Sequence, residues 1–404
     1  MRKAIFIGLI MCILSFAAIV PGAMGNSVGH VIWTQASNPS AYWEGANDVA
    51  VDGTAVYIAG SDYSSGGGRW RMEKRSLTDG SIIWTQASNP SVFSDDPNGV
   101  AVDSTGVYIV GSDSSPGLGN YRWRIEKRSL TTGSIIWTQT SNPSVGYDVA
   151  TGVAVDGSGV YIVGEDEYLG NNSRWRIEKR SLTTGSIIWT QASNPSAYWE
   201  GATGVAVDGG GVYIVGSDRT LGSANARWRI EKRSLTTGSI IWTQASDPST
   251  LSDYATGVAV DGSGVYIVGD DSYTGNARWR IEKRNLTTGS TIWTQANNPS
   301  VYSDGARGVA ADGSGGVYIV GYDSSLGSGN ARWRIEMRIT ADGSISWTDA
   351  SNPSASGDWA TRVAVNGSGV YIVGSDLYAG GGRWRIEKRY HYCVYIQLVG
   401  HVCI

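Results

Sequence analysis

Cysteine, histidine and phenylalanine are all scarce, with three copies of each among the 404 residues. The cysteines are Cys12, Cys393 and Cys403, and His30 is the one histidine before residue 390. A Ser–His–Asp or Cys–His catalytic device is therefore nearly excluded from most of the chain. Few cysteines also fit an exported protein whose core is large enough to fold without disulfides.

Long hydrophobic runs are lacking too, except at the N-terminus. Arg2 and Lys3 precede an apolar run from Ala4 to Val20, and Pro21 and small residues follow. This pattern predicts a signal peptide over residues 1–25, with an uncleaved membrane anchor as the alternative. We therefore expect a secreted, periplasmic or cell-surface protein, monomeric and without a membrane span once the signal is removed.

Neither sign of charge is in large excess. Without Arg2 and Lys3, 30 basic residues face 36 acidic ones, a formal net charge of −6. Basic positions recur close to acidic ones, so nucleic acid is not an expected partner.

The chain contains one repeated unit in seven copies. Its tryptophan marker recurs at spacings of 51 to 54 residues, at Trp33, Trp84, Trp137, Trp189, Trp242, Trp293 and Trp347. Each unit predicts four short strands, which in the clearest copy are Gly152–Asp156, Val160–Gly164, Arg174–Arg180 and Ser186–Gln191. Turn sequences such as DGSG and SLTTG separate these strands, and helical periodicity is absent. The sequence predicts an all-β protein, with repeats that stack into one array.

Counting strands gives the number of blades. The repeat region, residues 26–389, begins with a strand of the fourth type, Val31–Gln35, and ends with one of the third type, Arg383–Arg389. The N-terminal strand is therefore free to complete the last blade, which removes the open edge between the first and last blades. We predict a seven-bladed β-propeller of four-stranded antiparallel blades, followed by a non-repeat tail at residues 390–404.

Two short motifs carry a family resemblance across residues 29–389. The segment Asp156–Gly164, DGSGVYIVG, resembles the repeat of an exported seven-bladed β-propeller family. The segment Thr183–Trp189, TTGSIIW, is similar to the T-G-x-x-x-W docking motif of quinoprotein dehydrogenases and their non-enzymatic relatives. The resemblance implies a propeller and raises pyrroloquinoline quinone as a cofactor. However, Lys179 and Ser181 stand where the quinoprotein motif has Ala and Asp, and the usual eight blades and adjacent cysteines are missing.

The third strand concentrates charge and aromatic residues. It carries 27 of the 30 basic residues, and the exceptions are Arg219, Arg307 and Arg362. Strand alternation places Glu178 between Arg176 and Arg180 on one face. We interpret this register as a structural lattice of ion pairs, and an anion-binding girdle of arginines is the alternative. The tryptophans of the third and fourth strands are predicted to pack between blades.

Two loop types differ between copies and are expected on the same rim. They are the loop before each first strand, here called the inter-blade loop, and the loop between the second and third strands. Variable loops on a constant scaffold are typical of recognition surfaces. We expect rings of carboxylates to stand on this rim among aromatic side chains. The candidate binding residues are Trp43, Glu44, Asp95, Asp148, Trp199, Glu200, Asp253, Asp304, Asp358 and Trp359.

The best single candidates are two identical loops, SAYWEGA at Ser40–Ala46 and at Ser196–Ala202. Aromatic rings that stack on sugar faces, with charged groups for hydroxyls, favour a non-catalytic, multivalent binding module for an extracellular glycan or an envelope protein. Calcium is not required, because screened carboxylates repel weakly and no D-x-D-x-D loop is present. No cofactor is predicted.

An enzyme that uses rim or channel carboxylates, glycoside-active or quinoprotein-like, is the alternative function. Distinct polar residues at the axis would favour the enzyme, and symmetric pockets would favour the binding module.

The tail carries two His-x-Cys pairs, His391 with Cys393 and His401 with Cys403. A hairpin could bring them together as zinc ligands, and a Cys393–Cys403 disulfide is a second outcome. The main expectation is an unstructured or unrelated terminus, and an outer strand that competes with Val31–Gln35 for the last blade is a further alternative.

Overall fold

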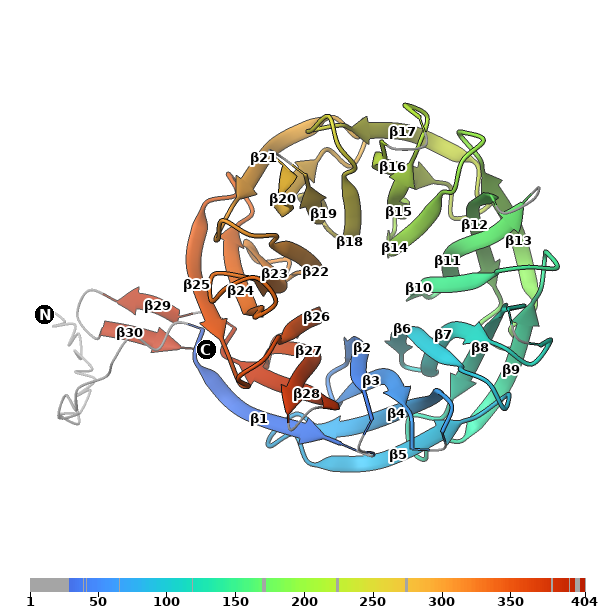
Figure 1. The fold of residues 1–404 in the computed structure, drawn as a ribbon, viewed down its shortest axis with the longest axis horizontal. Helices are drawn as coiled ribbons and strands as arrows, with labels where there is room; N and C mark the ends of the chain where they lie inside the picture. Colours follow the sequence, from blue (N-terminus) through green and yellow to red (C-terminus); the bar gives the residue numbers. More distant parts are fainter. Residues whose placement is uncertain are drawn as a thin grey trace, which may run out of the picture.

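Seven four-stranded antiparallel sheets surround a central axis in the computed structural model (Figure 1), which confirms the predicted seven-bladed propeller. The structure describes residues 29–403 except 39, 41, 65, 118, 169–171, 223–224, 273–274, 379–380, 392 and 397–399. The predicted signal peptide lies outside the described residues. Within them, no helix is long and apolar enough to cross a bilayer.

In every blade the strands run from the axis outward in the same order (Figure 1). The innermost strands are β2 (Gly45–Val51), β6 (Asp96–Asp103), β10 (Val149–Asp156), β14 (Gly201–Asp208), β18 (Tyr254–Asp261), β22 (Gly305–Ala311) and β26 (Trp359–Asn366). The second strands are β3 (Ala55–Asp62), β7 (Gly106–Asp113), β11 (Gly159–Tyr168), β15 (Gly211–Asp218), β19 (Gly264–Asp271), β23 (Gly316–Asp323) and β27 (Gly369–Tyr378).

The outer half of each blade carries the tryptophans. The third strands are β4 (Arg69–Ser76), β8 (Arg122–Arg128), β12 (Asn172–Arg180), β16 (Arg227–Arg233), β20 (Arg278–Arg284), β24 (Arg332–Ile339) and β28 (Gly381–Arg389). The outermost strands are β5 (Ile82–Ser88), β9 (Ile135–Ser141), β13 (Ile187–Ser193), β17 (Ile240–Ser246), β21 (Thr291–Asn297), β25 (Ile345–Ser351) and β1 (Val31–Ser37).

The Asp of the DGSG sequence forms the turn between the first two strands. We number the blades 1 to 7 in the order of their innermost strands, from β2 to β26. In blade 3, Oδ1 of Asp156 accepts the backbone N–H groups of Ser158 and Gly159 at 2.7 and 3.0 Å. Tyr161 of the next strand donates to Oδ2 of the same carboxylate at 3.3 Å. One carboxylate thus satisfies the turn and holds the following strand, as Asp residues in tight turns commonly do.

The glycine of the TTG sequence joins neighbouring blades. Gly185 has φ +70°, and a Cβ there would lie 2.8 Å from the ring of Trp137 in the preceding blade. The indole N–H of Trp137 donates to the carbonyl of Leu182 in the same turn at 3.3 Å. The TTGSIIW motif therefore describes how one blade docks on the next, and a side chain at this glycine would prevent the contact.

The N-terminal strand β1 closes the ring as the fourth strand of blade 7 (Figure 1). Gly29 takes the place of the turn glycine here, with φ +72° and Trp347 of blade 6 packed against it. Its carbonyl accepts Nη1 of Arg389 at 2.8 Å, as Gly185 accepts Nη1 of Arg180 at 2.8 Å in blade 3. The closure therefore repeats the bonds of an ordinary blade with residues 360 positions apart.

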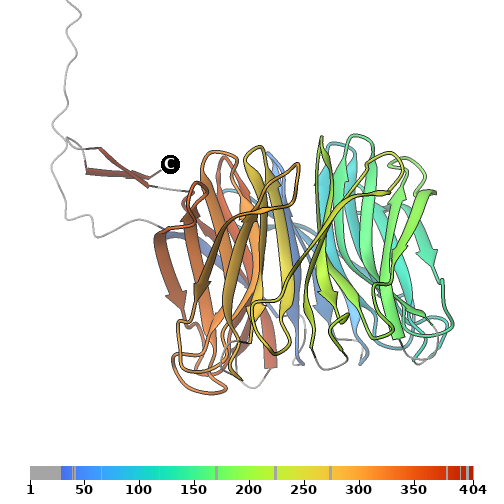
Figure 2. The same ribbon diagram turned by 90° about the horizontal axis from the view of Figure 1, so that it is seen from above.

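The tail forms a hairpin of its own outside the ring, with β29 (Cys393–Ile396) paired to β30 (Gly400–Cys403). Figure 2 shows the propeller edge-on, with this hairpin beyond its circumference. These two strands contradict an unstructured terminus, and they agree with a terminus unrelated to the repeat. The alternative of a tail strand in the last blade is wrong as well, because β1 holds that edge.

Third-strand tryptophans form the core between blades. All seven are fully buried, and each indole N–H donates to a backbone carbonyl of the following blade, as Trp175 does to Ser217 at 3.0 Å. The packing role predicted for them is confirmed, and burial of this many large rings supplies much of the hydrophobic stabilisation.

The charges of the third strand form the predicted ion-pair lattice. Glu178 is fully buried and binds Nη2 of Arg176 at 2.7 Å and Nη2 of Arg180 at 2.6 Å. Ser141 of the preceding blade donates to the same carboxylate at 2.8 Å. Asp166 binds Arg174 at 2.7 Å and lies 3.4 Å from Arg176. A buried charge is costly unless it is paired, so this lattice holds the blades together.

The substitution Glu178→Gln should lower the free energy of unfolding by about 3 kcal/mol or more, because it leaves two arginines without their buried partner. Urea denaturation followed by circular dichroism measures the change. Asp247→Asn is the matched control, since it removes the same charge from an exposed position and introduces the residue that the other copies carry there. Equal stability of the two variants would show that the lattice does not stabilise the fold.

Candidate functional site

The carboxylates of the inter-blade loops are buried, so the expectation that they stand on the rim is wrong. Glu44, Asp95, Asp148, Glu200, Asp253, Asp304 and Asp358 are all 0% exposed. Asp148 accepts the hydroxyl and the backbone N–H of Ser144 at 2.8 and 3.1 Å, and the N–H of Glu167 at 3.2 Å. Burial raises the pKa of Asp148, and these bonds oppose the rise.

The physical reason lies in the S-x-x-x-[DE] spacing of these loops. A serine four residues earlier bonds each of Asp95, Asp148, Asp253, Asp304 and Asp358, and each of these Asp residues also accepts a backbone N–H from the loop after the second strand. A carboxylate that satisfies two loops replaces water inside the protein. These acids therefore shape the rim loops, and their oxygens do not face solvent.

The aromatic candidates stay at the surface, and the structure brings two of them together. Trp43 and Trp199 are 52% and 47% exposed. Trp359, at the start of β26, lies 5.9 Å from Trp43 between ring centroids. Tyr42, Trp43, Tyr63 and Gly66 line a hollow of about 460 Å³. The exposed Trp43 and the half-buried Trp359 therefore form an aromatic pair, whereas Trp199 stands in blade 4.

A second hollow of about 400 Å³ lies in the central channel, on the side where the innermost strands begin. Each innermost strand has a β-bulge near its start, between its second and fourth residues. A bulge adds one residue and redirects its side chain. The seven bulge residues, all of which line the channel, are Asn47, Asn98, Thr151, Thr203, Thr256, Arg307 and Thr361.

Six of these seven residues hydrogen-bond the next blade. Thr256 donates to the carbonyl of Ala306 at 2.7 Å, and Thr361 closes the ring by donating to Ala46 at 2.7 Å. Asn47, Asn98, Thr151 and Thr203 make the equivalent bonds at 2.6 to 2.9 Å. The ring is broken at one place, between blades 6 and 7, where Arg307 replaces Thr or Asn.

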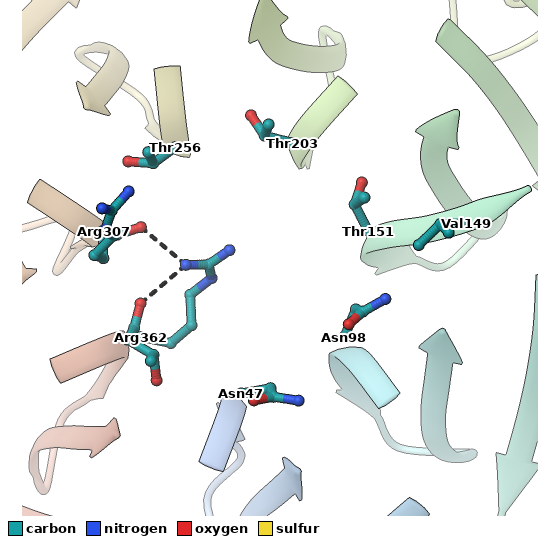
Figure 3. A pocket seen from close by; sticks show the side chains of 9 residues that line it. Asn47, Asn98, Val149, Thr151, Thr203, Thr256, Arg307 and Arg362 are labelled. Carbon is teal, nitrogen blue, oxygen red and sulfur yellow. Dashed lines mark hydrogen bonds between the residues drawn. The ribbon is translucent and has the colours of Figure 1, made fainter. Parts of the chain in front are cut away.

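The bulge position and the position after it can be compared in all seven blades. Among these described residues, the charged ones lie only beside this break. Three charged residues on consecutive blades make up what we call the charged arc. They are Arg307 of β22, Arg362 of β26 and Asp48 of β2. Glycine stands at the position of Asp48 and Arg362 in the other five blades. Figure 3 shows the guanidinium of Arg362 extending into the channel beside Arg307, with Asn98, Thr151 and Thr203 on the far side.

The arc is held by weak ion pairs and strong backbone bonds. Nη1 of Arg362 donates to the carbonyls of Arg307 and Thr361 at 3.0 and 2.9 Å, while its Nε lies 4.0 Å from Oδ1 of Asp48. Asp48 accepts the N–H groups of Val49 and Val100 at 2.9 and 2.8 Å. Burial raises the pKa of Asp48 to about 6, although Arg362 opposes the rise.

Two more acids depart from the repeat behind the channel wall. The position directly before the Asp of the V-G-x-D sequence is Ser in four of the seven second strands. Blade 3 has Glu165 there, and blade 5 has Asp270. Burial raises the pKa of Glu165 to about 7 and that of Asp270 to about 6. Asp270 lies 3.5 Å from Nη1 of Arg307, and Glu165 accepts the Ser173 hydroxyl at 3.0 Å.

The sequence analysis did not select the channel residues as a site, although it noted Arg307 and Arg362 as exceptions. The charged arc and the two acids can be found in the sequence, because each differs from the residue that most copies carry at the same position. The axis is therefore asymmetric, and seven equivalent pockets do not describe it.

Comparison with known proteins places the fold and leaves the activity open. No protein-family model matches the chain, and no curated protein sequence matches it. The polysaccharide lyase Uly1 aligns at a TM-score of 0.53 with 8% identity, over 87% of this chain and 90% of the lyase. A quinohemoprotein alcohol dehydrogenase from Pseudomonas putida aligns at 0.51 with 12% identity, over 90% and 68% of the two chains.

A protein solved together with a segment of a partner protein is similar to a comparable degree. Sqt1 of Chaetomium thermophilum, bound to the N-terminus of a ribosomal protein, aligns at a TM-score of 0.50 with 12% identity, over 86% of each chain. At these identities the likeness shows the fold alone. The chain is a propeller that resembles those of quinoprotein dehydrogenases in structure.

The channel does not fit a calcium-bound quinone. Calcium takes six to eight oxygen ligands, but both oxygens of Asp48 accept backbone N–H groups. The described residues contain no group of three His, Cys, Asp or Glu placed to hold a metal. We derive no chemistry through such a cofactor.

The tail candidates for a zinc site can be followed only in part. His391 is held against blade 6, with its ring 5.6 Å from that of Tyr318 and its Nε2 3.8 Å from Asp312. In the hairpin register Cys393 faces Cys403 and Tyr395 faces His401. The side chains of Cys393, His401 and Cys403 lie outside the described residues, so the disulfide stays a prediction.

Asp48 should make the stability depend on pH. A carboxyl whose pKa is about 6 in the folded chain and 3.8 ordinarily holds its proton more tightly when folded. Its stabilising effect is complete below about pH 4 and is lost as the pH rises through about 6. Asp48→Asn should therefore gain stability relative to wild type, by on the order of 2 kcal/mol, between about pH 4 and about pH 8. Urea titrations at both pH values measure this, and a difference that does not change with pH would contradict it.

Proposed function

We propose that the protein is an exported binding module that takes a carbohydrate on the aromatic side chains of one rim. The pair of Trp43 and Trp359 carries the proposal. Fourteen of the seventeen tryptophans lie in third and fourth strands and pack between blades, whereas Trp43 is 52% exposed on a loop. An exposed indole beside a second indole offers two faces for the C–H groups of sugar rings.

The surroundings of the pair suit a sugar. The hydroxyl of Tyr63 lies 3.5 Å from Asp96, so a polar edge borders the hollow beside Trp43. Gly66, with φ +85°, brings no side chain into this hollow. A hollow of about 460 Å³ is within the range of ligand sites.

Further aromatic groups on the same rim support several contacts along a polymer. Tyr121 and Tyr147 pack edge to face at 4.7 Å between blades 2 and 3, and Trp199 stands exposed in blade 4. Several weak sites on one polysaccharide would act together through avidity. An envelope protein stays the alternative partner.

An enzyme is the second candidate function, and the asymmetric axis favours it. Burial raises the pKa of Glu165 to about 7 and that of Asp270 to about 6, the range that suits proton transfer near neutral pH. Incubation with polysaccharides, followed by an assay for new reducing ends, tests this. Product formation that Glu165→Gln abolishes would support catalysis and overturn the non-catalytic proposal.

Trp43→Ala should weaken polysaccharide binding at least tenfold if stacking on the pair supplies on the order of 1.5 kcal/mol. Affinity electrophoresis in gels with xylan, pectin or hydroxyethyl cellulose measures it. Trp199→Ala is the comparison variant, because it changes the same residue in an identical SAYWEGA loop; it should weaken binding less, since the ring pair consists of Trp43 and Trp359 and leaves Trp199 as one weaker contact. Retention by Trp43→Ala equal to that of wild type would remove the basis of the proposal.

A further inference from the structure

The third-strand arginines and the two channel arginines differ in the distance to their nearest carboxylate. Each of the 21 third-strand arginines has a carboxylate oxygen within 3.1 Å, as Arg128 has Glu126 at 2.6 Å. The two channel arginines have none so close, since Arg307 lies 3.5 Å from Asp270 and Arg362 lies 4.0 Å from Asp48. Bidentate pairing with a carboxylate is the arrangement that arginine forms best, so both channel arginines lack it.

Arg362 still has donors to offer. Its Nη1 bonds two backbone carbonyls, which fix the guanidinium in the channel, but its Nη2 and Nε make no hydrogen bond with the described residues. The side chain is 29% exposed, on the inside of the ring. Figure 3 shows the guanidinium directed toward the open centre. Two donor nitrogens of a fixed cation, with three N–H groups between them, are therefore left for a ligand in the hollow.

Arg307 stands beside it with similar freedom. Its guanidinium lies 5.2 Å over the ring of Tyr322 and 3.4 Å from that tyrosine's hydroxyl, which hold it in place. The side chain is 36% exposed and makes no bond to the next blade, unlike the threonines at its register. The charge of Arg307 thus faces the same hollow as that of Arg362.

The opposite wall is neutral and accepts hydrogen bonds. The hydroxyl hydrogens of Thr151, Thr203 and Thr256 are donated to backbone carbonyls, so their oxygens face the channel as acceptors. A ligand that suits both walls has a negative group on one side and hydroxyl donors on the other. A sugar acid has this pattern, and a hollow of about 400 Å³ accommodates a ligand of that size.

We infer that the channel mouth is an anion-binding site in which Arg362 and Arg307 bind the carboxylate of an acidic sugar. The threonine wall takes the sugar hydroxyls. Inorganic phosphate has the same oxyanion chemistry and is the competing source. This site is separate from the aromatic pair of the proposed function, although β26 carries both Trp359 and Arg362. Loss of polysaccharide binding on Trp43→Ala therefore does not decide it.

The test is isothermal titration of the full chain without its predicted signal peptide, with D-glucuronate, D-glucose and inorganic phosphate as separate probes. About pH 6 is suitable, because burial raises the pKa of Asp48 and Asp270 to about that value and their opposing charges are reduced. We expect glucuronate to bind, glucose to bind at least tenfold more weakly, and phosphate to compete weakly. Phosphate that binds as tightly as glucuronate would reject the sugar acid as the ligand.

Arg307→Gln is the main variant, since it keeps the backbone carbonyl that accepts Arg362 and removes a loose 3.5 Å ion pair to Asp270 of the preceding blade, so the fold should stay intact. Arg362→Lys is the second variant, because it keeps the positive charge but removes the guanidinium group that can bind both oxygens of a carboxylate. Each should weaken glucuronate binding at least tenfold, while Arg219→Gln, which removes the same charge from a rim loop, should not. Unchanged binding in Arg307→Gln and Arg362→Lys, equal loss in Arg219→Gln, or no binding to wild type would overturn the inference.

Discussion

In every blade a buried glutamate lies between two arginines of its own strand, and in six blades a side chain of the preceding blade donates to the same carboxylate. This arrangement decides what the remaining charges can do. A buried ion must be paired, so the third-strand arginines are committed to the fold and are not available to a ligand. The girdle of arginines suggested by composition is therefore a structural device, and only the departures from it remain for recognition.

The requirement that buried charges be paired also distinguishes the rim loops from the central channel. The inter-blade carboxylates resemble a ligand-binding ring in the sequence, yet all seven are buried, and the five Asp residues among them are each bound by a serine and a backbone N–H of the neighbouring loops. The exposed residues are aromatic, and the incompletely paired charges lie in the channel. A symmetric scaffold with one asymmetric arc suits one ligand position at the axis, supported by weaker contacts along the rim.

Periodicity and strand count predicted most of the fold, because each copy repeats the same turns, tryptophans and charge register. Alternation in Arg174–Arg180 correctly placed Glu178 between its arginines. The rim acids were misjudged because sequence shows that an acid lies in a loop, but not that Ser144 turns Asp148 inward. The channel was missed because a β-bulge, which moves Arg307 and Thr361 into the axis, leaves no mark in the hydrophobic pattern.

We infer that the departures from the repeat at the axis serve binding at a cost in stability. Asp270 is buried and only loosely paired, and Arg307 interrupts the hydrogen-bonded ring. The variant Arg307→Thr with Asp270→Ser restores the residues that most copies carry. Its free energy of unfolding, measured by urea denaturation, should exceed that of wild type by about 1 kcal/mol, because one hydrogen bond is added and one loosely paired, buried carboxylate is removed. An unchanged or lower free energy of unfolding would contradict the account.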